Sequence, residues 1–237
     1  MNGNVAIVEV AELVKIVSRE LDDVARKQMP FATVLGLTLT AKAVQADIKA
    51  QLPKIFDRPT PWTINSIGMA PAKFGVASSV FIRSQSPTGT PASKYLGPEI
   101  EGGHRRVARF ERRINAQARI PEQMMIAAKG ATLDGFGNMQ RAQINRIIRN
   151  MNAMGPFKKN KEPRKEFFVG KAKANGQPLA IYQIVARGKV VPVIAFLHRQ
   201  PDYSTRFPFQ KLVQESATKH FLPSLQAGMA KAMASRR

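Results

Sequence analysis

The chain of 237 residues contains no cysteine. Disulfides, thiolate metal sites and a cysteine nucleophile are therefore excluded, and the composition is typical of a protein made in a reducing cytoplasm. The first residues lack a charged-then-apolar signal pattern, because Glu9 and Glu12 interrupt the early apolar positions. No run of residues reaches the ~18 apolar positions that a membrane helix needs. The sequence thus predicts a soluble protein with no membrane partner.

Residues that catalyse reactions or bind metals are also sparse. The three histidines, His104, His198 and His220, have no carboxylate at a ligand spacing such as HxxxH or HExxH. No G-x-S-x-G nucleophile elbow occurs. The glycines at 102–103 and 135–137 lack the other residues of a dinucleotide fingerprint or a phosphate loop. We therefore predict a protein that is not an enzyme and that has no metal and no cofactor.

The acidic residues Glu99 and Glu101 come nearest to an acid/base pair. In a strand, this spacing places the two side chains on opposite sides, which disfavours a shared catalytic role. We predict instead that Glu101 pairs with a nearby arginine such as Arg105. A deep pocket lined by His198, Glu99 or Asp134 is what an enzyme hypothesis would require.

The chain lacks the patterns of an enzyme or a metal site, but it carries a large excess of positive charge. The chain holds 37 Lys and Arg against 16 Asp and Glu, which gives a net charge of +21. Residues 104–173 hold 17 of the basic residues and five acidic ones. A charge run is ordinarily a solvated face, but an excess of this size indicates an anionic partner. Arginine suits both DNA phosphates and the carboxylates of an acidic protein, so both partners stay open.

Two groups of basic residues are the candidate contact surfaces for a protein partner or DNA. The first group lies on a short helix expected at 105–117, and the second lies in a polar, basic loop expected at 155–165. No helix-turn-helix, zinc finger or RNA-recognition pattern is present, so a DNA contact would be independent of base sequence. The candidate residues are Arg105, Arg106, Arg109, Arg112 and Arg113 in the first group, and Lys158, Lys159, Lys161, Arg164 and Lys165 in the second.

The hydrophobic periodicity predicts an α+β fold. We expect a mainly antiparallel sheet packed with long N- and C-terminal helices, in a single domain over 1–237 with a basic helical insertion at about 104–173. Pro223 predicts a kink or a restart in the last helix. The expected helices are 5–28, 31–55, 105–117, 139–151 and 209–233, and the expected strands are 63–70, 73–83, 166–169, 179–186 and 190–197.

A proline-rich link follows the second expected helix. The segment 58–63 reads Arg-Pro-Thr-Pro-Trp-Thr. Proline restricts its own backbone and that of the preceding residue, so the link is expected to be extended and stiff. Trp62, the single tryptophan, is predicted to be a buried anchor where this link meets the sheet, in preference to the alternative of an exposed binding residue.

Three short segments follow the order of a known family. They are Pro59-Thr60-Pro61-Trp62-Thr63, then Tyr95-Leu96-Gly97-Pro98-Glu99-Ile100-Glu101-Gly102-Gly103, then Phe207-Pro208-Phe209 before the last helix. In this order the chain resembles the tail completion and minor tail proteins of long-tailed bacteriophages, the group that includes minor tail protein Z and the related neck, or virion morphogenesis, proteins. It departs from their pattern at Leu96, where a small residue is usual, and in the long insertion before the last helix.

The resemblance implies a structural part of the virion that is made in the host cytoplasm and has no catalytic role. It implies a homo-oligomeric ring at the head–tail junction or the upper tail. The implied partners are other tail and neck proteins, namely the tail terminator, the connector and the tube. The family has no counterpart of the basic insertion, so a sequence-independent nucleic-acid-binding protein stays as the alternative function.

Overall fold

The computed structural model describes residues 18, 26, 28–87, 89–152, 166–170, 179–186 and 189–235. The chain forms two compact units. The first, which we call the helical unit, consists of Met1–Leu96 and Phe207–Arg237. The second, the inserted unit, consists of Gly97–Arg206. The sequence predicts a single domain with an insertion at about 104–173, whereas the compact inserted unit has wider bounds.

The described elements alternate helices and short strands along the chain. The helices are α2 (Met29–Ile55), α3 (Pro61–Ile64), α4 (Ala92–Glu101), α5 (Arg109–Ala118), α6 (Arg141–Asn152) and α7 (Phe209–Ala234). The strands are β1 (Ile67–Ala70), β2 (Ser79–Ile82), β3 (Gly103–His104), β4 (Met125–Ala127), β5 (Phe167–Gly170), β6 (Ala180–Ala186), β7 (Lys189–Phe196) and β8 (Asp202–Tyr203).

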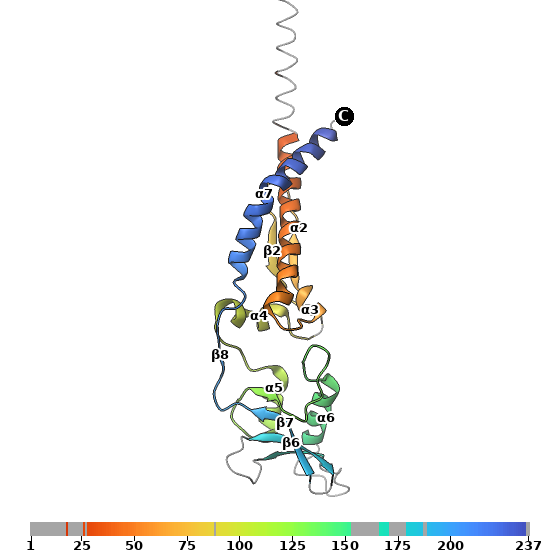
Figure 1. The fold of residues 1–237 in the computed structure, drawn as a ribbon, viewed down its shortest axis with the longest axis vertical. Coiled ribbons are helices and arrows are strands. Elements are labelled where there is room, and N and C mark those ends of the chain that lie inside the picture. Colours follow the sequence, from red (N-terminus) through yellow and green to blue (C-terminus); the bar gives the residue numbers. More distant parts are fainter. Residues whose placement is uncertain are drawn as a thin grey trace, which may run out of the picture. The chain divides into compact units, whose positions relative to one another are not determined.

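In the helical unit, α2 and α7 lie side by side and run in opposite directions (Figure 1). Small residues let the two backbones approach closely. Ala32 and Ala232 are each 1% exposed, and a Cβ added to Gly228 would lie 2.7 Å from the carbonyl oxygen of Ala32. The close approach therefore depends on a glycine at this position.

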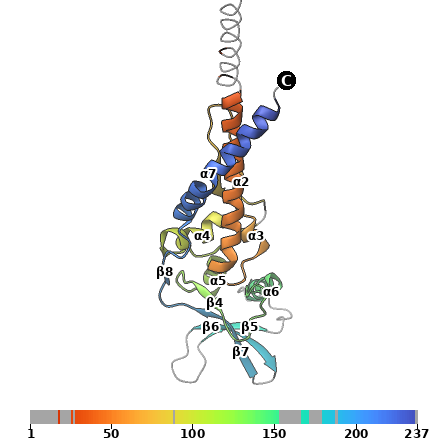
Figure 2. The ribbon, with the colours of Figure 1, turned by 45° about the horizontal axis from the view of Figure 1, so that its top comes forward.

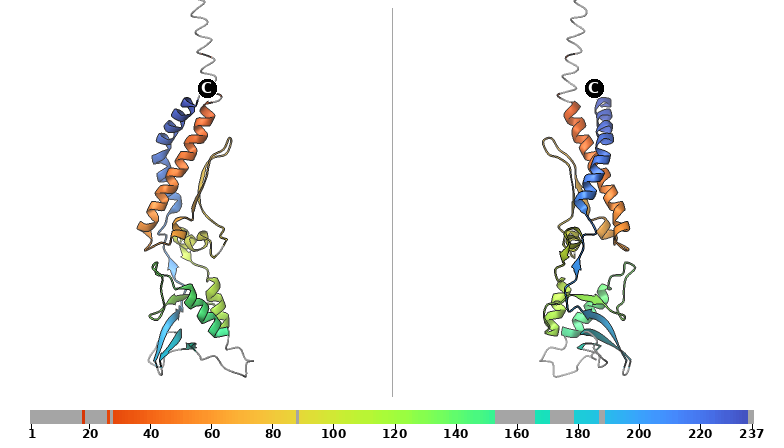
Figure 3. Two further views of the ribbon diagram at one scale, coloured as in Figure 1. Left: turned by 90° about the vertical axis from the view of Figure 1, so that its right-hand side faces the viewer. Right: turned by 60° about the vertical axis from the view of Figure 1, so that its left-hand side comes forward.

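The β1–β2 hairpin lies beside α2 in the same unit (Figure 3). Three side-chain hydrogen bonds join the hairpin segment to the helix. Gln45 Nε2 donates to Ile67 O at 2.8 Å, Ala72 N donates to Thr38 Oγ1 at 3.1 Å, and Ser78 Oγ donates to Leu37 O at 2.9 Å. These bonds fix the hairpin along the helix without a larger sheet.

The aromatic anchor of the helical unit is Phe207 and not Trp62. Phe207 is fully buried and makes edge-to-face contacts with Phe56 and Phe209, with ring centroids 5.9 and 5.7 Å apart. Trp62 is 48% exposed, so the prediction of a buried tryptophan is wrong. The predicted extended link is also wrong at this point, because Thr60 accepts a hydrogen bond from Thr63 N and caps the short helix α3.

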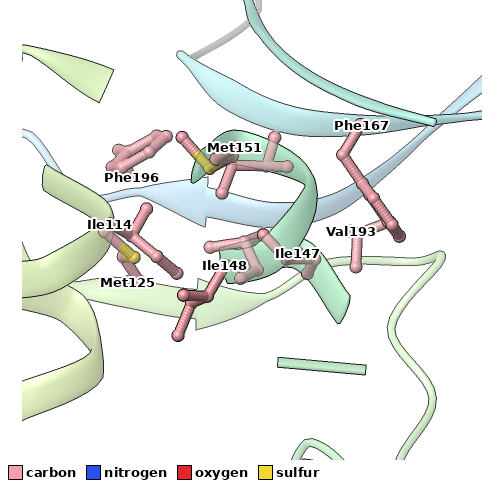
Figure 4. Close-up of a cluster of buried hydrophobic side chains, with 10 residues drawn as sticks. Ile114, Met125, Ile147, Ile148, Met151, Phe167, Val193 and Phe196 are labelled. Carbon is pink, nitrogen blue, oxygen red and sulfur yellow. The ribbon is translucent and has the colours of Figure 1, made fainter. Parts of the chain in front are cut away.

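The inserted unit contains a four-stranded antiparallel sheet in the order β4-β7-β6-β5. Helices α5 and α6 lie next to this sheet (Figure 2). Figure 4 shows their buried side chains meeting those of the strands: Ile114 from α5, Ile147 and Ile148 from α6, and Phe167 and Phe196 from the sheet. The insertion thus has a hydrophobic core of its own.

The structure confirms the α+β fold with long helices and antiparallel sheets. Helix α7 continues through Pro223. The predicted helix at 5–28 and the basic loop at 155–165 fall outside the described residues, apart from single positions of the helix. The strand interpretation of Glu99 and Glu101 is wrong, since both residues lie in helix α4.

Candidate interaction surface

Helix α5 has one buried side and one exposed side that carries arginines. Ile114 and Asn115 are buried, while Arg109, Arg112 and Arg113 are exposed. The helix has no side-chain acceptor at its N-cap, Ala108. Glu111 at the third position reaches back instead and accepts a 2.6 Å hydrogen bond from Ala108 N.

Glu111 is also the centre of a buried polar cluster. Its carboxylate is fully buried and accepts hydrogen bonds from Arg105 Nη1 and Nη2 at 2.8 and 2.6 Å and from Met125 N at 2.9 Å. Burial alone would raise the pKa of Glu111, but these bonds, first those from Arg105, lower it below its ordinary value. Arg105 therefore pairs with Glu111, and the predicted pair with Glu101 is wrong.

Helix α6 repeats the pattern of α5. Its buried side carries Ile147, Ile148 and Met151. Arg141 and Arg149 are exposed at a spacing of eight residues, so they lie on one side of the helix. The helix has no acidic residue.

Helices α5 and α6 pack on one hydrophobic core, and five of their arginines are exposed; we call this group of residues the arginine face. Within the described residues, none of the five makes an ion pair with an acid. Arg146 of α6 differs, because it pairs with Glu166 and lies 5.6 Å from the centre of the Phe167 ring. The members of the arginine face are Arg109, Arg112, Arg113, Arg141 and Arg149.

The predicted contact residues differ in their exposure and in whether the structure describes them. Arg109, Arg112 and Arg113 are exposed as predicted, and Arg106 is exposed just before the helix. Arg105 is partly buried in its pair with Glu111. Lys158, Lys159, Lys161, Arg164 and Lys165 lie outside the described residues. Sequence reasoning missed Arg141 and Arg149, although their spacing in a helix without acids was a usable signal.

A second ion pair lies where α4 and the end of the inserted unit meet. Arg206 Nε and Nη2 donate to the two carboxylate oxygens of Glu99 at 2.7 Å each, and Arg206 N donates to Glu99 O at 3.0 Å. The hydrogen bonds with Glu99 raise the pKa of Arg206. This bidentate contact joins the first and last segments of the inserted unit.

A serine, a histidine and an aspartate meet between α2 and α7. Ser216 Oγ and His220 Nε2 each lie 2.8 Å from the same oxygen, Asp47 Oδ2. In a catalytic triad the carboxylate orients the imidazole toward the serine hydroxyl. Here both groups bond to the carboxylate, so the cluster joins two helices and does not activate Ser216.

The Asp47 cluster makes the helical unit sensitive to acid. Hydrogen bonds from Ser216, and then from His220, lower the pKa of Asp47. A carboxylate with a lowered folded-state pKa stabilises the fold above its unfolded pKa, and this contribution is lost as pH falls through the folded value. Because the Asp47 side chain is 40% exposed, we expect a loss of no more than about 1 kcal/mol below about pH 4.

The variant Asp47→Asn tests this expectation. Urea midpoints followed by Trp62 fluorescence should differ between pH 6 and pH 3 by less in Asp47→Asn than in the wild type. Asp57→Asn is the matched control, since the Asp57 side chain is 80% exposed. Equal pH dependence in Asp47→Asn and the wild type would contradict the assignment.

Comparisons with protein-family models, curated proteins and solved structures return no match to this chain. In the part of the chain that the structure describes, no group of three His, Cys, Asp or Glu side chains could hold a metal ion. The described helices also include none that is long and apolar enough to cross a membrane.

Proposed function

We propose that the chain is a structural virion protein of a tailed bacteriophage. In this role it is a tail completion or minor tail protein that joins the upper tail to the head–tail connector, or neck. It acts through contacts with other tail and neck proteins and with further copies of itself, without catalysis.

The observation that carries the proposal is where the family-like segments lie. Thr63, from the first segment, hydrogen-bonds through its Oγ1 to the hydroxyl of Tyr95, from the second, at 3.0 Å. Phe207 and Phe209, from the third segment, pack in the same helical unit. The second segment crosses the boundary at Leu96, so its residues 97–103 belong with 104–206 to the other compact unit. The order of the three family-like segments, with one long insertion between the second and the third, accounts for a helical unit that holds parts of all three.

Exposed apolar side chains on the helical unit also support the proposal. Phe74 and Val76, between β1 and β2, are 71% and 60% exposed. On α7, Phe221 and Leu222 are 45% and 60% exposed. Two different apolar patches on one subunit suit a head-to-tail contact between copies, which closes into a ring when the rotation allows it.

Deleting the coding region from the phage that encodes the chain tests the proposal. We expect filled heads and tails to accumulate separately, and we expect the wild-type chain supplied in trans to restore joined, infectious particles. Negative-stain electron microscopy of the lysates counts heads, tails and joined particles. A deletion that leaves the yield of joined particles unchanged would overturn the proposal.

The isolated chain gives a second measurement. A subunit that is ordered by its place in a ring should be monomeric or weakly associated when purified. Analytical ultracentrifugation over a range of concentrations measures this directly. A tight small dimer that retains a bound small molecule would count against a neck or tail subunit.

A further inference from the structure

The helices of the two units carry different basic residues. Helices α2 and α7 of the helical unit contain lysine and no arginine, whereas α5 and α6 of the inserted unit contain arginine and no lysine. Across residues 97–152 there are nine arginines and one lysine. Lysine and arginine serve equally well on a face that contacts only water. The division between the two units therefore indicates a ligand that requires the guanidinium group.

The arginine face also carries uncompensated repulsion. Arg109 lies three and four residues before Arg112 and Arg113, so the three charges are neighbours on α5. The single acid of that helix, Glu111, is buried against Arg105 and does not face outward. Helix α7 differs, because there Lys211 faces Glu215 at an i,i+4 spacing. An anionic ligand over α5 and α6 would remove the repulsion.

We propose that the arginine face binds the sugar–phosphate backbone of duplex DNA, independently of base sequence. This inference goes beyond the proposed structural role and does not depend on it. Arg141 and Arg149 are eight residues apart, about 12 Å along α6. Phosphates on one DNA strand recur every ~3.4 Å along the duplex axis, so this row of α6 spans several of them.

The residues of α5 and α6 themselves favour a duplex over a single strand. Binding of single strands relies on exposed aromatic rings on which bases stack. The single aromatic residue of α5 and α6 is Phe110, and it packs against the hydrophobic core of the inserted unit. Asn145 lies between Arg141 and Arg149 on the same side of α6 and is exposed, so its amide can donate to phosphate.

The test measures how salt changes the affinity of the full chain for a fluorescein-labelled DNA duplex of arbitrary sequence. Fluorescence anisotropy gives the dissociation constant between about 50 and 200 mM salt, where each lost phosphate contact flattens the log–log slope by about 0.9. The triple variant Arg109→Gln, Arg112→Gln and Arg113→Gln should flatten the slope by about 2.7. The double variant Arg141→Gln and Arg149→Gln should flatten it by about 1.8.

A matched control removes the same charge from the helical unit. Lys42, Lys54 and Lys231 are exposed, and changing all three to Gln should leave the slope unchanged. Equal flattening in the lysine and arginine triple variants would overturn the proposal, because net charge alone would then explain binding. Absence of DNA binding by the wild type at the lowest salt would also overturn it.

A competitor distinguishes DNA from an acidic protein. Unlabelled duplex should displace the labelled duplex at a much lower charge concentration than poly-L-glutamate does. Equal competition by the two polyanions would assign the arginine face to carboxylates and overturn the proposal. Circular dichroism of each variant checks that the fold is kept. These results concern the isolated chain, so they are separable from the presence or absence of joined particles.

Discussion

Replacing Glu111 with glutamine is expected to lower the free energy of unfolding of the inserted unit by about 3–5 kcal/mol. The carboxylate is fully buried and accepts hydrogen bonds from Arg105, Ala108 N and Met125 N. A glutamine has one acceptor oxygen and presents an amide donor toward the remaining donors. The change therefore leaves the Arg105 guanidinium without its countercharge and leaves backbone N–H groups unsatisfied.

Urea unfolding followed by far-UV circular dichroism measures this loss. Trp62 lies in the helical unit, so its fluorescence reports that unit and should show an unchanged midpoint in Glu111→Gln. Glu122→Gln is the matched control, since Glu122 is exposed in the same unit. Its circular dichroism midpoint should match that of the wild type.

A double variant separates the charge pair from the other bonds of Glu111. Adding Arg105→Met to Glu111→Gln removes the uncompensated guanidinium and should recover part of the lost stability. The backbone donors of Ala108 and Met125 stay poorly satisfied, so recovery should be incomplete. A Glu111→Gln variant as stable as Glu122→Gln would contradict the role of this cluster.

Replacing Gly228 with valine should destabilise the helical unit by about 3 kcal/mol or more. A Cβ at this position would lie 2.7 Å from Ala32 O and 2.9 Å from Gly36 N. Both are backbone atoms of α2, so no side-chain rotation relieves the overlap. The two helices would have to separate, which exposes the apolar surface that they bury against each other.

Trp62 fluorescence during urea unfolding measures this effect. Ala227→Val is the matched control, because Ala227 is exposed on the same helix, next to Gly228. Helix propensity alone predicts a loss of no more than about 0.7 kcal/mol for the control. If Gly228→Val and Ala227→Val unfold at the same urea concentration, then α2 and α7 do not depend on the glycine contact.

Local patterns in the sequence predict the elements that have a regular apolar repeat. Helices α2 and α7 and strands β5, β6 and β7 form close to the expected residues. Their apolar positions repeat with one period over several turns or residues, and this signal does not depend on distant partners. Strand β4 has three residues, too few to show a period, so it is not among the expected strands.

The sequence could not predict the pairs that join distant residues. Glu99 and Arg206 are 107 positions apart, and Asp47 and His220 are 173 apart. Charge alone offers Glu101 as a partner for Arg105, but the cap geometry of α5 places Glu111 there instead. Trp62 is expected to be a buried anchor where the link meets the sheet, but in the helix α3 it is 48% exposed, and Phe207 is the ring that is fully buried.

The arginine face was partly predictable. The expected basic helix holds Arg109, Arg112 and Arg113, and their exposure follows from its apolar repeat. The contribution of Arg141 and Arg149 depends on α5 and α6 sharing one core, which no local pattern specifies. Arg105 could not be excluded from the face without the contact to Glu111.

If the chain comes from a tailed phage as proposed, cryo-electron microscopy of intact particles of that phage tests the central proposal most directly. The account predicts a ring of copies at the top of the tail or in the neck, with density that fits the helical unit and the inserted unit each as a compact body. Particles in which the chain is absent, or in which it lies away from the head–tail junction and upper tail, would contradict the account.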